Sequence, residues 1–286
     1  PDAMRVLRNN TVLTNAIGPH YDDTYAYKGA KEGESIRLRT PQEFSVRSGL
    51  TADVQAVEQK STTLTTNVIR GIDMKYSDAE LSQDVEGFME YRQAPAMAAL
   101  AGIVDSYLYE LFSDKVAQAV ALPTTALDID DVLNAGMILS NGTAPNDGKR
   151  MLIVNPKGNK QILSASSGLF NGVKPLSKNY EDGIITVPQL GFNFGTSQNV
   201  STHTTGGYDA NYDVATAPSS GDSTIAIDTG TGTINKGDIF TYPSVYAVNP
   251  NTKVSTGELK QFVCTADFAG GTGTLSFDPP IISSGA

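Results

Sequence analysis

The residue types that most often carry catalysis are scarce in this sequence. It contains two histidines, His20 and His203, and one cysteine. A Ser-His-Asp triad needs a histidine beside an activated serine, but His203 stands in the loop-like stretch Thr202-His203-Thr204 with no G-x-S-x-G motif. We therefore interpret both histidines as polar surface or interface residues. The chain is not expected to be an enzyme.

The single cysteine and the glycine-rich stretches also indicate structural roles. Cys264, in the sequence QFVCTAD, is expected to be a small buried residue on a strand, and it can form neither an internal disulfide nor a zinc cluster. Residues 230–232 and 270–273 are rich in glycine and lie between predicted strands. They lack the lysine and the spacing of a nucleotide-binding loop. Both stretches are therefore predicted to be turns.

Two clusters of aspartates could suggest a metal site. Asp128, Asp130 and Asp131 lack the central glycine and distal glutamate of a calcium loop, and helix capping explains them better. Asp22 and Asp23 are a pair that could bind a cation, but solvated loop carboxylates are the simpler interpretation. The sequence therefore predicts no metal and no cofactor.

Charged residues near the N-terminus suggest an interface with another subunit. In residues 34–40, ESIRLRT, apolar and charged residues alternate as in a half-buried strand, and residues 44–47 repeat this pattern. Residues 61–77 are rich in threonine and favour strand, so an extended two-stranded projection is predicted. Such charges either remain solvated or set the register against a neighbouring subunit. The candidate interface residues are Lys31, Glu32, Glu34, Arg37, Arg39 and Arg47.

A long helix is the element most strongly indicated by local pattern. Ser77 and Glu80 have the spacing of a capping box, and Pro95 predicts a kink or a restart. A helix over residues 78–120 would be about 60 Å long, with Pro123 ending it. Its apolar residues recur every three or four positions, which predicts one buried stripe: Leu100, Ile103, Val104, Tyr107, Leu108, Leu111, Phe112 and Val116.

After this helix the pattern changes twice. Asp128 or Asp130 is expected to cap a helix through Leu139, a strand is expected within 150–156, and a helix follows through Ser164. Residues 183–200 predict strand, turn and strand. Residues 218–282 predict a small β-barrel or sandwich, with a boundary at 217–222.

The composition indicates a folded, acidic protein. The 286 residues are 40% hydrophobic and 18% charged, and the net charge is -10. This negative charge argues against tight binding of nucleic acid, because such binding requires clustered Lys and Arg. No signal peptide is expected at residues 1–10 and no apolar run is long enough to span a membrane. Because the sequence opens without Met, a processed or trimmed product is expected.

Several stretches resemble the major capsid proteins of tailed bacteriophages, in the P22 coat protein-like branch of the HK97 fold. Residues 11–49 are similar to the N-terminal arm and extended loop of that family, and residues 71–108, with the phrase PAMAALA, to its spine helix. Residues 150–162 and 191–206 resemble its apical domain, and residues 237–267 its β-rich insertion.

The resemblance implies an α+β chain with an HK97-like capsid fold and five regions. They are an N-terminal arm (1–30), an extended β-hairpin loop with adjoining strands (31–76), a spine helix with peripheral domain (77–125), an apical α/β domain (126–217) and an inserted β-barrel-like module (218–282). It also implies hexamers and pentamers of this chain in an icosahedral virion shell, assembled in the host bacterial cytoplasm. That shell would enclose double-stranded DNA without sequence-specific binding. Scaffolding, portal and decoration proteins are candidate partners, and no membrane is expected.

Other interpretations stay open at this point. The family usually continues beyond the insertion, whereas this chain stops at ISSGA, so a fragment or a shorter member is expected. An encapsulin-like nanocompartment shell is one alternative, which the particle contents, DNA or enzyme cargo, would distinguish. A β-rich surface binding protein is another, but it leaves the long helix unexplained.

Overall fold

The computed structural model describes most of the second half of the chain and parts of the first. The described residues are 11–17, 35–39, 50, 54, 61–65, 68–75, 92–121, 126–166, 183, 185, 188–209, 211–249, 252 and 254–282. The chain divides into two compact units, one formed by Pro1–Ala16 with Met97–Ala286 and the other by Ile17–Ala96. The strand predicted over residues 44–47 lies outside the described residues.

The smaller unit contains a two-stranded antiparallel sheet. Strands β1 (Ser35–Arg39) and β2 (Ser61–Thr65) pair so that Ile36 is opposite Leu64. The strand predicted within 34–40 is therefore confirmed. Residues 68–75 follow without helix or strand, and Val68, Ile69, Ile72 and Met74 are all exposed. A two-stranded sheet is marginally stable on its own in water.

Helix α6 (Ala94–Lys115) is the longest helix among the described residues, and its end differs from the prediction. Two residues in π-helical geometry, 92–93, precede it, and Pro95 lies in its first turn, where proline is well tolerated. Residues 76–91, with the capping box predicted at Ser77 and Glu80, lie outside the described residues, so the kink or restart expected at Pro95 stays a prediction. Its 22 residues span about 33 Å. The prediction that the helix continues through Val120 to Pro123 is wrong, because the helix ends at Lys115.

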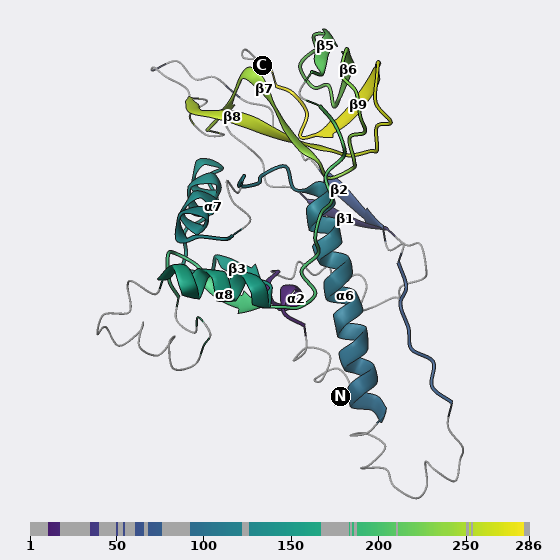
Figure 1. Cartoon of the computed structure of the whole chain (residues 1–286), viewed down its shortest axis with the longest axis vertical. Helices are drawn as coiled ribbons and strands as arrows, with labels where there is room; N and C mark the ends of the chain where they lie inside the picture. The colour runs from purple at the N-terminus through teal and green to yellow at the C-terminus, as the bar shows by residue number, and fades with distance from the viewer. Residues whose placement is uncertain are drawn as a thin grey trace, which may run out of the picture. The chain divides into compact units, whose positions relative to one another are not determined.

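Residues 126–196 form an α/β arrangement that local signals predicted well. Helix α7 (Ile129–Asn141) begins at a capping box in which Asp131 accepts from the Asp128 N–H at 2.9 Å. Strand β3 (Met151–Val154) leads into helix α8 (Pro156–Ala165), capped by Asn155. Strand β4 (Asn193–Thr196) then pairs with β3 in parallel. These elements lie together in Figure 1.

A small apolar core holds these four elements together. Val132 of α7, Val154 of β3 and Ile162 of α8 are buried with Ile185 and Phe192. Of the strand, turn and strand predicted for 183–200, the described part consists of a turn, closed by a bridge between Gln189 and Phe192, followed by β4.

The C-terminal region is a curled antiparallel sheet (Figure 1), which we call the β-module. Its strands are β5 (Asp213–Thr216), β6 (Thr224–Asp228), β7 (Ile239–Val248), β8 (Ser255–Cys264) and β9 (Gly273–Asp278), in the order β5-β6-β9-β8-β7. The described strands form an open sheet with β5 and β7 as edges, rather than a closed barrel. Strand β5 precedes the predicted boundary at 217–222, yet Val214 pairs with Ile227 and so adds β5 to the sheet.

Aromatic rings fill the core of the β-module. Phe240, Tyr242, Phe262 and Phe277 pack with ring centroids 5.3–5.9 Å apart, mostly edge to face. This is the preferred geometry for aromatic pairs. The fully buried members include Phe262, Phe277 and Cys264, which confirms the expectation that the cysteine is a buried strand residue.

We expect Phe262→Ala to lower the free energy of unfolding of the β-module by about 3–5 kcal/mol, because it removes a ring from the centre of the cluster. Urea denaturation followed by near-ultraviolet circular dichroism measures the change. Phe112→Ala is the matched control, since Phe112 is 46% exposed on α6. Equal losses for the two variants would contradict the assignment of the core.

Candidate functional site: helix α6 and its contacts

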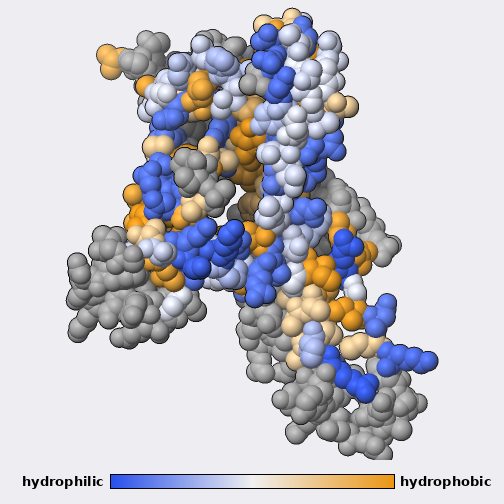
Figure 2. Space-filling view, viewed as in Figure 1, coloured by the Kyte–Doolittle hydropathy of each residue, from blue (hydrophilic) through white to orange (hydrophobic). Residues whose placement is uncertain are grey.

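The apolar stripe predicted on α6 is not buried in this chain. Ile103 is 47% exposed, Leu111 is 41% exposed, and Tyr107 between them is also exposed, as are Phe112 and Val116. No residue of the predicted stripe is in the buried class, so the prediction of a buried stripe is wrong. Figure 2 likewise shows hydrophobic residues reaching the surface in several places. Three of the exposed side chains, Ile103, Tyr107 and Leu111, recur every four residues and share one face of the helix, which we call the α6 stripe.

A different face of α6 is buried, and a carboxylate lies on it. Ala101, Asp105 and Tyr109 recur every four residues and are all buried, with Asp105 only 1% exposed. Asp105 accepts hydrogen bonds from the backbone N–H of Val12 at 2.7 Å and from the Thr14 hydroxyl at 2.9 Å. These bonds attach the short helix α2 (Leu13–Ala16) to α6. A buried carboxylate is tolerated only where hydrogen-bond donors surround it. The face that carries Asp105 therefore lies against residues 12–14, and the apolar stripe on another face of α6 is left exposed.

The segment after α6 is held by a side chain from the β-module. The Gln261 side-chain amide donates to the carbonyl of Ala119 at 2.8 Å, and its oxygen accepts from the Ala119 N–H at 3.0 Å. The side-chain amide of Gln261 thus bonds both the N–H and the carbonyl of Ala119, as the backbone of a neighbouring strand would. Ala119 cannot also direct its N–H to an intrahelical carbonyl, which explains why the helix does not run on to Val120.

An ion pair provides a second contact between α6 and the β-module. Lys236, in the turn before β7, pairs through its ammonium group with Asp114 in the last turn of α6. The hydrogen bond to Asp114 is the main cause that raises the pKa of Lys236. The backbone N–H of Lys236 donates to Asp267 at 2.8 Å, so the turn that carries the lysine is itself held in place.

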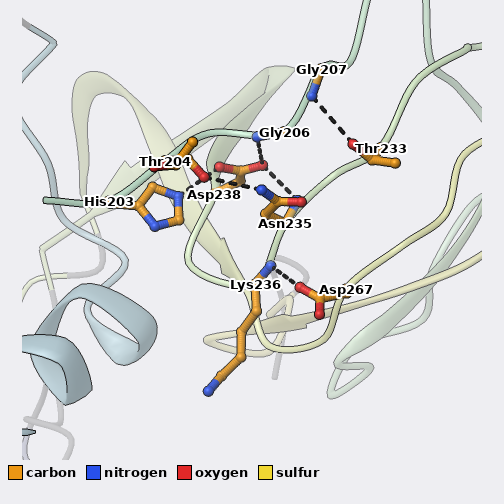
Figure 3. A network of polar contacts seen from close by, with 9 residues as sticks. All are labelled: His203, Thr204, Gly206, Gly207, Thr233, Asn235, Lys236, Asp238 and Asp267. Atoms are coloured by element: carbon orange, nitrogen blue, oxygen red, sulfur yellow. Dashed lines mark hydrogen bonds and ion pairs between the residues drawn. The ribbon is translucent and has the colours of Figure 1, made fainter.

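The same turn is organised by a buried carboxylate, as Figure 3 shows. Asp238 is 2% exposed and accepts from the His203 ring at 2.8 Å, from the Gly206 N–H at 3.0 Å and from the Asn235 N–H at 2.8 Å. Asn235 also donates through its side chain to the Thr204 carbonyl. The network therefore joins residues 203–206 to the turn at 235–238. His203, expected to be polar and non-catalytic, proves to be a partner of Asp238.

The predicted interface residues are only partly covered by the described structure. Arg37 and Arg39 lie on β1, where their backbones pair with Thr63 and Ser61. The other four, Lys31, Glu32, Glu34 and Arg47, lie outside the described residues, as do His20 and the pair at 22–23. Their interface role remains a prediction.

The described residues contain neither a metal-binding cluster nor a membrane-spanning helix. That part of the chain has no group of three or more His, Cys, Asp or Glu side chains arranged to hold a metal ion. None of its helices is long and apolar enough to cross a membrane. Asp128 and Asp131, weighed above as metal ligands, cap α7 instead.

The residues that sequence reasoning missed are those with distant partners. Asp105, Asp238 and Gln261 each bond across at least 32 residues of sequence. The sequence offered one weak signal for Asp105, a charged residue at helical spacing between Ala101 and Tyr109.

We expect the Cys264 thiol to be inert in the folded protein at pH 8. Burial, and secondarily the charge of Asp238, raises its pKa to about 12, so the reactive thiolate is scarce. Because the folded-state pKa is raised, this contribution to stability is present below the unfolded pKa of about 8.5 and is lost as the pH rises towards 12. Ellman's reagent measures reactivity: we expect no fast reaction in buffer and complete reaction in urea. Rapid reaction in buffer would contradict burial of the thiol.

Similarity to known proteins is found at the level of structure. No family model matches the sequence, and no curated protein matches it. A solved chain from Mycobacterium phage Che8 is similar with a TM-score of 0.49 and 15% sequence identity, over 93% of this chain and 86% of that chain.

Proposed function

We propose that this chain is a structural capsid subunit of the HK97-like class, which self-assembles into hexamers and pentamers of an icosahedral phage head around double-stranded DNA. The sequence resemblance to the coat proteins of tailed phages suggests this function. It requires no catalytic residue and no cofactor. The chain would act in the virion after assembly in the bacterial cytoplasm.

The observation that carries the proposal is the α6 stripe. Ile103, Tyr107 and Leu111 are exposed although they lie at the spacing of a core-facing helix. Water-exposed apolar surface of this kind marks interaction sites when it is contiguous. A subunit designed for assembly would cover such a face with its neighbours, whereas a lone monomer would gain nothing from it.

Two further observations agree with assembly. The sheet formed by β1 and β2 has only two strands, and such a sheet needs additional packing to be stable. The net charge of -10 opposes tight binding of the subunit to DNA. A container filled with DNA by a motor benefits from an inner wall that does not bind its contents.

An encapsulin-like nanocompartment shell remains the second candidate, since the same exposed helix face would serve it equally. Purified particles that contain an enzyme and no DNA would favour that candidate. A β-rich surface binding protein is the third, and it would leave the α6 stripe without a partner.

We expect the double variant Ile103→Ser and Leu111→Ser to lose assembly while keeping its fold, because it removes the apolar contact area of the α6 stripe. Light scattering coupled to size-exclusion chromatography, together with negative-stain microscopy, measures the assembled fraction. We expect at least a tenfold decrease, and circular dichroism checks the fold.

The matched control is Leu133→Ser with Met137→Ser, which removes two exposed apolar side chains from one face of α7. This control should assemble as the unmodified chain does. Normal particles from the α6 variant would show that the α6 stripe is not an assembly contact.

We expect charge reversal at both Arg37→Glu and Arg39→Glu to impair assembly, because like charges across an interface repel. The monomer's circular dichroism should remain unchanged. Lys149→Glu with Lys157→Glu, two exposed lysines of the larger unit, is the control for total charge. If the β1 variant forms particles in normal yield, these arginines are merely solvated.

A further inference from the structure

The β-module is attached to the end of α6 by a small set of polar contacts. One is the Lys236–Asp114 ion pair and the other is the pair of hydrogen bonds between Gln261 and Ala119. Gly237 lies between them at φ +93°, where a Cβ would be 3.1 Å from the Ser113 carbonyl oxygen and 2.9 Å from the His203 ring. The two backbones therefore meet closely at this point without a side chain between them.

Beside these contacts the apolar surfaces do not pack. An open cavity of about 710 Å³ lies between the end of α6 and the β-module, and its lining includes Phe112, Val116, Val120, Ile239 and Phe240. A second hollow, of about 280 Å³, separates α7 from the hairpin of β7 and β8. Packed interiors have few voids larger than one water molecule. Over these two hollows the facing surfaces are not in contact, so dispersion contributes little there.

The β-module itself is packed in the opposite way. Its buried apolar residues form a core cluster. The Asp238 carboxylate accepts a hydrogen bond from the Asn235 N–H and so stabilises the turn at 235–238. Residues 203–206 are bonded to that turn, so they move with the β-module. The connection to β4 then runs through residues 198–202, which have no regular structure.

We propose that the β-module is held by a two-part latch and turns as a folded unit about residues 198–202 when the latch opens. Lys236 with Asp114 is one part, and Gln261 with Ala119 is the other. The latch is a property of the single chain. It stands whether or not the proposed assembly does.

A distance measurement on the single chain tests the latch. Spin labels are placed at Ser106→Cys on α6 and at Thr274→Cys on β9, both exposed positions, and the buried Cys264 stays unlabelled. Pulsed electron paramagnetic resonance should give one narrow distance distribution. Adding Lys236→Met and Gln261→Leu should broaden it at least twofold or add a second distance. Lys260→Met, one residue from Gln261 on β8, is the matched control and should leave it narrow.

Ellman's reagent on the Lys236→Met and Gln261→Leu variant with its native Ser106 and Thr274 shows whether the β-module stays folded. An inert Cys264 together with a broadened distribution supports the latch. An unchanged distribution overturns it, and so does a reactive Cys264, because release must leave the core intact. As a second measurement, 1 M salt should broaden the distribution of the Gln261→Leu single variant reversibly, since salt screens the partly exposed ion pair. No change with salt would remove Lys236–Asp114 from the latch.

Discussion

The hydrogen bonding of two buried carboxylates is the constraint on which the larger unit depends. Asp105 and Asp238 are each almost fully buried, and a buried charge is costly unless donors surround it. Asp105 meets this need with the backbone and hydroxyl groups of residues 12–14, and Asp238 with His203, Gly206 and Asn235. One carboxylate thereby orients α6 against α2, and the other shapes the turn that reaches α6. Removing either would leave several donors without acceptors, which costs more than one bond is worth.

The orientation that Asp105 imposes on α6 has a consequence for the surface of the chain. With Ala101, Asp105 and Tyr109 turned inward, Ile103, Tyr107 and Leu111 are turned outward. A helix cannot bury both faces against a single neighbour. One orientation of α6 therefore both buries the polar network around Asp105 and exposes the apolar stripe. This relationship is why the α6 stripe carries the proposed structural function better than any isolated hydrophobic residue could.

Packing differs sharply between the inside of the β-module and its junction with α6. Inside, four aromatic rings contact one another at 5.3–5.9 Å. At the junction, polar contacts flank a cavity of about 710 Å³. The first arrangement specifies a shape through many weak contacts, whereas the second specifies a position through a few directional bonds. A unit that is rigid inside and lightly attached outside can change position without changing structure.

Local sequence determined the elements whose signals lie within a few residues of one another. The caps of α7 and α8 depend on partners three residues away, and the sequence predicted both helices. Only the tertiary structure decided where α6 ends, which of its faces is buried and that β5 joins the sheet. Those outcomes depend on Gln261 bonding to Ala119 across 142 residues, on Asp105 bonding to Val12 across 93, and on Val214 pairing with Ile227. Periodicity cannot anticipate them, because a helical pattern records which residues share a face but not which distant donors will meet that face.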